Sequence, residues 1–99
     1  KYVAAETAKC SIDQTGTAMD DNLDCTDRKT GTTVATAAQT ALSDFKNSFD
    51  SSKDAIIITG TPEQGQTLIS QSGSDITIST CFEEGCDSSK FMKNDVSVE

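Results

Sequence analysis

The stretch Thr33–Phe49, TVATAAQTALSDFKNSF, carries the clearest structural signal in this chain. Its apolar residues recur at three- and four-residue spacing, which is the period of an amphipathic helix. Thr32 and Thr33 carry hydroxyls that can cap the first turn. We therefore expect one helix over the whole stretch, with two phenylalanine rings supplying most of its buried area. The apolar positions are Val34, Ala38, Ala41, Leu42, Phe45 and Phe49.

The length of 99 residues predicts a single domain spanning residues 1–99. A chain of this size buries only ~60 to 65% of the surface that its unfolded form exposes. Apolar residues make up 34% of the chain, whereas an average domain has roughly 45 to 50% on a similar count. The hydrophobic core is therefore small, and we expect a further source of stability.

The four cysteines are that source, because an even number in a short chain is typical of disulfides formed in an oxidising compartment. Three pairings are possible, and we favour Cys10 with Cys25 and Cys81 with Cys86. Four thiolates could instead hold zinc, but no Cys-x-x-Cys spacing occurs. We expect two disulfides and a periplasmic, surface or secreted protein.

The formal net charge of -8 argues against binding of nucleic acid or of an anionic membrane surface. The only basic concentrations, Arg28-Lys29 and Lys90 with Lys93, are small. No apolar run is long enough to span a bilayer, and no signal peptide is visible. Because the chain begins with Lys1 rather than Met, we expect it to be a processed or truncated product.

The remaining elements follow from local patterns. Lys1–Ile12 is free of Gly and Pro and predicts a first helix, in which Val3, Ala8 and Ile12 share a face. Met19–Gly31 is expected to be a polar loop. Short runs rich in isoleucine and threonine predict strands. These expected strands cover residues 54–59, 66–71 and 75–81, with a fourth, edge strand over 95–98.

Together these patterns predict an α+β domain. An N-terminal helix and a second amphipathic helix pack on a three- to four-stranded antiparallel β-sheet, and two disulfides stabilise it. Short connections between successive strands favour an antiparallel meander. In the third strand Ile76 and Ile78 form the inner row, which Phe82 continues, while Cys81 faces the other way.

Histidine is absent, which excludes Ser-His-Asp and Cys-His nucleophiles and any histidine-based metal site. Glu83-Glu84, or the acids between Asp20 and Asp27, could act as an acid and base pair. Such chemistry needs a carboxyl in an apolar pocket, whereas these acids lie in polar stretches. We therefore expect neither an enzyme nor a cofactor.

One candidate for cation binding stays open. The run from Asp20 to Asp24 places oxygen ligands at alternate positions, as the start of an EF-hand loop does. Cys25 then stands where that loop needs glycine, and Gly31 stands where it needs its final glutamate. An irregular site would draw its ligands from Asp20, Asn22, Asp24 and Asp27.

The opening Lys1-Tyr2-Val3-Ala4 resembles the place in type IV pilins where the hydrophobic half of the spine helix ends and its water-soluble half begins with Tyr-Val-Ala. The order of elements is also similar to that family. A helix is followed by a variable loop, an antiparallel sheet and a disulfide-bounded loop near the carboxyl terminus, here Cys81 to Cys86. The resemblance implies the soluble domain of a pilin, minor pilin or pseudopilin that lacks the hydrophobic N-terminal half of its helix.

The resemblance also implies a function, that of a structural subunit of a type IV pilus-like surface filament serving adhesion, motility or a related role. Its partners would be copies of itself in the filament and, before assembly, the inner membrane, through the missing N-terminal segment. The precursor would face the periplasm and the filament would lie outside the cell. The Met19–Gly31 loop and the Cys81–Cys86 loop would be exposed for contacts. The implied subunit-packing residues are Lys1, Tyr2, Val3, Glu6 and Lys9, of which Glu6 and Lys9 would pair between subunits.

A second function remains open, that of a small secreted, disulfide-stabilised binding module or inhibitor whose loops hold a partner.

Overall fold

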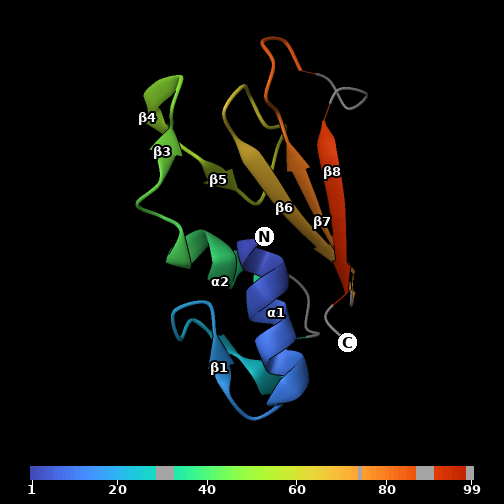
Figure 1. The fold of residues 1–99 in the computed structure, drawn as a ribbon. Coiled ribbons are helices and arrows are strands. Elements are labelled where there is room, and N and C mark those ends of the chain that lie inside the picture. The colour runs from blue at the N-terminus through green and yellow to red at the C-terminus, as the bar shows by residue number, and fades with distance from the viewer. Residues whose placement is uncertain (29–32, 74, 87–90, 98–99) are drawn as a thin grey trace.

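A computed structural model describes residues 1–28, 33–73, 75–86 and 91–97, and it confirms an α+β fold with two α-helices and two disulfides (Figure 1). The described elements, in chain order, are α1 (Tyr2–Ile12), β1 (Thr17–Ala18), β2 (Leu23–Asp24), the 3-10 helix η1 (Cys25–Asp27), α2 (Thr33–Ala41), β3 (Lys46–Asn47), β4 (Asp50–Asp54), β5 (Ile56–Ile57), β6 (Thr67–Ser72), β7 (Asp75–Thr80) and β8 (Met92–Ser97).

The largest sheet has the strand order β5-β6-β7-β8. The last three strands form the expected antiparallel meander, in which Ile78 lies opposite Ile69 on one side and Asn94 on the other. The prediction of a wholly antiparallel sheet is wrong for β5, which runs parallel to β6. Residues 58–66 carry the chain back to the end of the sheet where β5 began, so the two strands start together. β8 also begins earlier than expected, at Met92, and Val98 lies outside the described residues.

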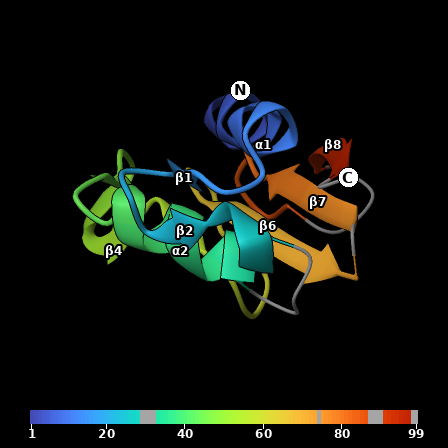
Figure 2. The ribbon, with the colours of Figure 1, turned by 90° about the horizontal axis from the view of Figure 1, so that it is seen from below.

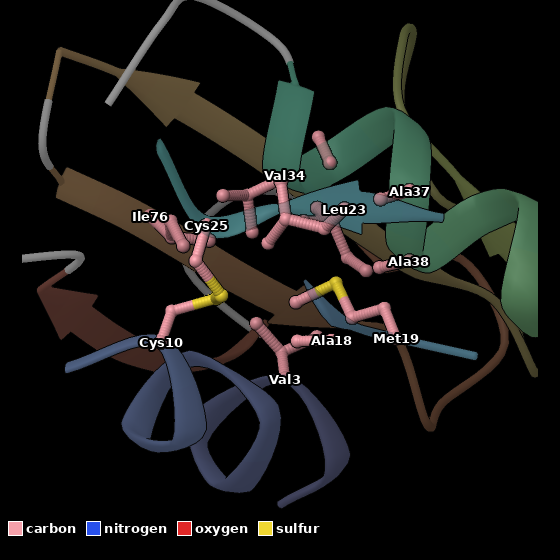
Figure 3. Close-up of a cluster of buried hydrophobic side chains, with 12 residues drawn as sticks. Val3, Cys10, Ala18, Met19, Leu23, Cys25, Val34, Ala37, Ala38 and Ile76 are labelled. Carbon is pink, nitrogen blue, oxygen red and sulfur yellow. A yellow bond between two sulfur atoms is a disulfide. The ribbon is translucent and has the colours of Figure 1, made fainter. Parts of the chain in front are cut away.

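The core lies between one face of this sheet and the two helices. Ile69 and Ile76 are fully buried on the sheet, and Ile78 and Val96 are partly buried beside them. The β1–β2 hairpin lies between α1 and α2, as Figure 2 shows from below. Its apolar side chains meet those of both helices (Figure 3). These helix and hairpin core residues include Val3, Met19, Leu23, Val34 and Ala38.

The helix expected over Thr33–Phe49 forms only over its first 9 residues. α2 begins at Thr33 as expected but ends at Ala41, and it buries valine and alanine rather than phenylalanine. Phe45 and Phe49 are 61% and 64% exposed. After α2 the Ser43 N–H donates to the Thr40 carbonyl oxygen and the Phe45 N–H to the Leu42 carbonyl oxygen, so the helical hydrogen-bond pattern gives way to turns. The chain then enters the β3–β4 hairpin. The proposed cap Thr32 lies outside the described residues.

The first helix is confirmed, with Lys1 as its N-cap rather than its first residue, but its predicted face is wrong. The buried residues of α1 are Val3, Glu6, Thr7 and Cys10. Positions separated by three, four or seven residues share a helix face. Ala8 follows Val3 by five residues and therefore lies on the other side of the helix. Ile12 is accordingly 89% exposed.

The expected polar loop after Met19 is instead part of the core. Met19 and Leu23 are fully buried, although the acids between them are exposed. Three successive residues, Met19, Asp20 and Asp21, have left-handed backbone angles with φ of 55, 56 and 66°. This tight reversal, closed by the Asn22 N–H donating to the Met19 carbonyl oxygen at 3.1 Å, turns both apolar side chains inward. Gly31 lies outside the described residues.

The predicted directions of Cys81 and Phe82 are reversed. Cys81 is fully buried and Phe82 is 51% exposed. β7 ends at Thr80, and Cys81 pairs with the chain before β6 rather than continuing the inner row. The Cys81 N–H donates to the backbone carbonyl oxygen of Gln66 at 3.0 Å, and the Cys81 carbonyl oxygen accepts from the Gly65 N–H at 2.9 Å. This pairing brings the Cys81–Cys86 loop beside the turn that precedes β6.

Candidate functional site

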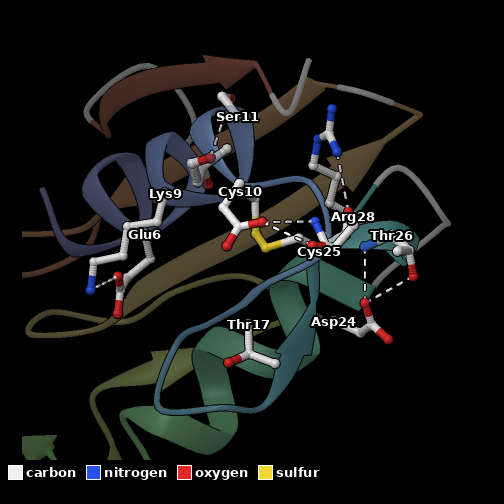
Figure 4. Close-up of a disulfide and its surroundings, with 12 residues drawn as sticks. Glu6, Lys9, Cys10, Ser11, Thr17, Asp24, Cys25, Thr26 and Arg28 are labelled. Carbon is white, nitrogen blue, oxygen red and sulfur yellow. Dashed lines mark hydrogen bonds and ion pairs between the residues drawn. A yellow bond between two sulfur atoms is a disulfide. The ribbon is translucent and has the colours of Figure 1, made fainter.

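Both favoured disulfides are confirmed, Cys10 with Cys25 and Cys81 with Cys86. The first joins the last turns of α1 to η1 and is buried at both ends (Figure 4). The second closes a small ring directly after β7. Because all four sulfurs are bonded to one another in pairs, none is left as a thiolate for zinc.

The four candidate cation ligands are not brought together. Asp24 caps η1 instead: its Oδ1 accepts from the Thr26 N–H at 3.0 Å and from the Thr26 hydroxyl at 2.8 Å. The hydrogen bond from the Thr26 N–H has the larger effect and the one from the Thr26 hydroxyl the smaller, and both lower the pKa of Asp24. Asn22 donates to the Met19 carbonyl oxygen at 3.0 Å. Within the described ranges, which include Asp20 and Asp27, no three carboxylate or thiol side chains converge.

The helix residues singled out for subunit packing are divided between the core and the surface. Val3 is buried in the domain's own core. Tyr2 is partly buried against the same core, and burial, followed by the nearby carboxylates of Asp20 and Glu6, raises its pKa. Lys1 is exposed at the start of the helix.

Glu6 and Lys9 pair with each other within the domain. Their Oε2 and Nζ atoms are 2.6 Å apart on successive turns of α1 (Figure 4). The carboxylate of Glu6 is nearly buried, and its hydrogen bond raises the pKa of Lys9.

The opposite face of α1 is exposed, and Lys9 is the charged residue of α1 on it. Ala4, Ala5 and Ala8 are all exposed, and Ile12 continues the row. Side chains this small allow another helix to approach the backbone closely. α1 therefore has two distinct sides, one packed on the core and one open.

A cavity of about 510 Å³ lies at the other end of the molecule, where three loops meet. We call it the loop cleft. Its walls come from the β3–β4 hairpin, the turn before β6 and the Cys81–Cys86 loop. Residues that line it include Asn47, Phe49, Asp50, Pro62, Glu63 and Glu84.

The side chain of Asn47 holds the first two walls together. Asn47 is 2% exposed; its Nδ2 donates to the Gln64 carbonyl oxygen at 2.8 Å, and its Oδ1 accepts from the Phe49 N–H at 2.8 Å. Gly65 is needed opposite, because a Cβ there would stand 2.8 Å from Asn47 Cγ and from Phe49 Cδ2, and closer still to Asn47 Oδ1. The side chain of Pro62 is fully buried. The cleft is therefore built by specific contacts.

Asp50 in the loop cleft is suited to binding rather than to acid catalysis. Hydrogen bonds from the Ser52 hydroxyl and N–H, together with nearby Lys53, lower the pKa of Asp50. A general acid needs the opposite shift. Lys53 also pairs with Glu63, and this hydrogen bond raises the pKa of Lys53. Asp50 is thus a permanent negative charge at neutral pH.

The sequence pattern distinguishes neither Asn47 nor Gly65, and it predicts that Phe49 is buried, whereas Phe49 is exposed. The Asn-x-Phe and Pro-x-x-Gly spacings are ordinary turn chemistry, so nothing local distinguishes them from other turns. Only the pairing of the two turns makes a cleft.

Comparison of the chain with protein-family models, with curated proteins and with solved structures finds no match in any of the three. Over the described residues, neither helix has the length and apolar character that crossing a bilayer requires.

Proposed function

We propose that this domain is the outward-facing part of a type IV pilin-like subunit that assembles into a surface filament. The observation that carries the proposal is the two-sided α1. One side packs through Val3, Thr7 and Cys10 on the core, and the other presents Ala4, Ala5 and Ala8 to the exterior. A spine helix needs both sides, because it must hold its own domain and also contact the spines of neighbouring subunits.

Two further features support the proposal. The Cys10–Cys25 disulfide ties α1 covalently to η1, so a pull along the helix is carried in part by this bond. The antiparallel strands β6 and β7 follow α1 along the chain and precede the Cys81–Cys86 loop. Adhesion, motility or a related surface role would follow from the filament, and the filament would lie outside the cell.

The sequence encoded immediately before Lys1 tests the proposal first. The proposal expects about 20 or more hydrophobic residues there, preceded by a short basic leader, because such a segment spans a bilayer. A cleavable signal peptide in that place, or a polar segment, would refute it.

Substitution on the open side of α1 tests filament assembly itself. In the producing organism, Ala8→Arg should abolish surface filaments seen by electron microscopy with antibodies against this domain, since a long cation prevents close helix approach. The matched control is Thr36→Arg, which places the same side chain on the exposed side of α2. Normal filaments in the Ala8→Arg strain would contradict the proposed packing.

The loop cleft favours a second candidate, a secreted binding module. The two candidates differ in what precedes Lys1, so the first experiment also separates them.

A further inference from the structure

Three phenylalanine rings are exposed on this small domain, and one of them lines a cavity. Phe45, Phe49 and Phe82 are each more than half exposed. Only Phe49 among these three contributes to the wall of the loop cleft. An aromatic ring left open inside a hollow is a surface that a partner's apolar side chain can cover, and such rings dominate binding energy at interfaces.

The walls around Phe49 are held in place before any partner arrives. The Phe49 backbone N–H is fixed by Asn47, and Asn47 is fixed by Gln64. Behind the turn, Gln66 Oε1 accepts from the Glu63 N–H at 2.9 Å, and Gln66 Nε2 donates to the Asp54 carbonyl oxygen at 3.0 Å. A site arranged in advance loses little conformational entropy on binding.

The charge of the cleft selects the kind of partner. Asp50, Glu63 and Glu84 bring one carboxylate from each of the three walls. Lys53 pairs with Glu63 and lies 3.9 Å from Asp50, but one ammonium cannot neutralise three carboxylates. The chain as a whole carries a net charge of -8. Anionic partners are therefore repelled and cationic ones are attracted.

We propose that the loop cleft binds a basic peptide segment of another protein, with an apolar side chain on the Phe49 ring and Lys or Arg side chains at Asp50 and Glu84. The carboxylates are spread over separate loops and, across the described residues, no three acids converge on one point. That spacing fits a chain with several cations better than it fits a single metal ion. This inference does not depend on assembly into a filament.

The test measures binding of a fluorescein-labelled peptide, Lys-Leu-Lys-Ser-Lys-Leu, to the purified oxidised chain by fluorescence anisotropy. The same peptide with Glu in place of Lys is the charge control. We expect saturable binding of the basic peptide that weakens with added salt, and no binding of the acidic one.

Variants locate the binding site. Phe49→Ser should weaken binding about tenfold, because the ring is the apolar anchor. Glu84→Gln should weaken it about threefold, as expected for one exposed charge pair. The matched controls are Phe45→Ser, which removes an equally exposed ring outside the cleft, and Asp20→Asn, which removes one negative charge in the β1–β2 turn. Circular dichroism verifies that each variant folds.

Several results would overturn the inference. Equal losses in Phe49→Ser and Phe45→Ser, or in Glu84→Gln and Asp20→Asn, would mean that attraction is general to the acidic surface. Failure of the basic peptide to bind, or equal binding of the acidic one, would exclude the partner class. Self-association of the chain that disappears in Phe49→Ser would identify a second copy as the occupant, and saturable binding of a neutral oligosaccharide at Phe49 would identify a glycan.

Discussion

The side-chain amide of Asn47 donates to the backbone carbonyl oxygen of Gln64 at 2.8 Å, and this hydrogen bond joins two turns that are separated along the chain. One turn belongs to the β3–β4 hairpin and the other precedes β6. Asn47 is almost completely buried, so the bond is shielded from competing water. This contact joins two walls of the loop cleft, and its neighbour Gly65 provides the means to test it.

Gly65→Ala should destabilise the domain by about 3 kcal/mol, which combines left-handed backbone strain with overpacking. Gly65 has φ of +87°, and an added Cβ would collide with the side chains of Asn47 and Phe49. Urea denaturation followed by circular dichroism measures the loss.

Gly60→Ala is the matched control for this change. Gly60 has a similar φ of +83°, but nothing lies within 4 Å of an added Cβ. Only the backbone strain of about 1 to 2 kcal/mol should remain. Equal losses in the two variants would show that Asn47 does not fill the space beside Gly65.

Removal of the first disulfide should cost more than removal of the second. The cysteines are 15 residues apart in Cys10–Cys25 and 5 apart in Cys81–Cys86. The chain-entropy model then gives about 3 kcal/mol for the first and about 2 kcal/mol for the second. Paired Cys→Ala variants of each bridge, compared by thermal unfolding, test the order. A larger loss from the smaller ring would contradict an entropic origin.

Asp20→Gly should stabilise the domain by about 0.5 kcal/mol, because glycine adopts the left-handed conformation without a Cβ penalty. Asp20 has φ of 56° and its side chain is exposed in the β1–β2 turn. Asp20→Ala keeps the Cβ penalty of the left-handed conformation, which alanine tolerates less well than aspartate does. This variant should be less stable than the parent chain. Unfolding midpoints in urea compare the three proteins. A glycine variant no more stable than the alanine variant would show that this turn is not strained.

Stability should fall in acid partly through Asp24. Its pKa in the folded state lies below the ordinary 3.8 because Thr26 donates two hydrogen bonds to it. The stability that ionised Asp24 contributes is therefore complete above the ordinary pKa of 3.8. It is lost as the pH falls through the lower pKa of the folded state. Asp24→Asn keeps an oxygen that can accept from Thr26 but removes the titration.

Thermal unfolding of the parent chain and of Asp24→Asn between about pH 6 and pH 2 tests this linkage. The melting temperature of the parent should decline more steeply at the acid end, so that the gap between the two proteins changes with pH. Parallel curves over the whole range would exclude a role for Asp24 in acid unfolding.

Much of this protein is determined by sequence alone, because the relevant signals are local. The absence of histidine excludes whole classes of chemistry, and the helical pattern after Lys1 and the alternation around Ile76 lie within single elements. Of the three possible disulfide pairings, the one that we favour from the sequence is confirmed.

Tertiary structure decided the features that depend on contacts between distant residues. Phe45 and Phe49 have helical spacing, yet α2 ends before them and the chain forms a hairpin, which leaves both rings exposed. Met19 and Leu23 stand among acids, yet a left-handed turn directs them into the core. The parallel direction of β5 and the loop cleft likewise arise only when separate turns meet. Local periodicity reports which side of an element is apolar, but burial is decided by what packs against it.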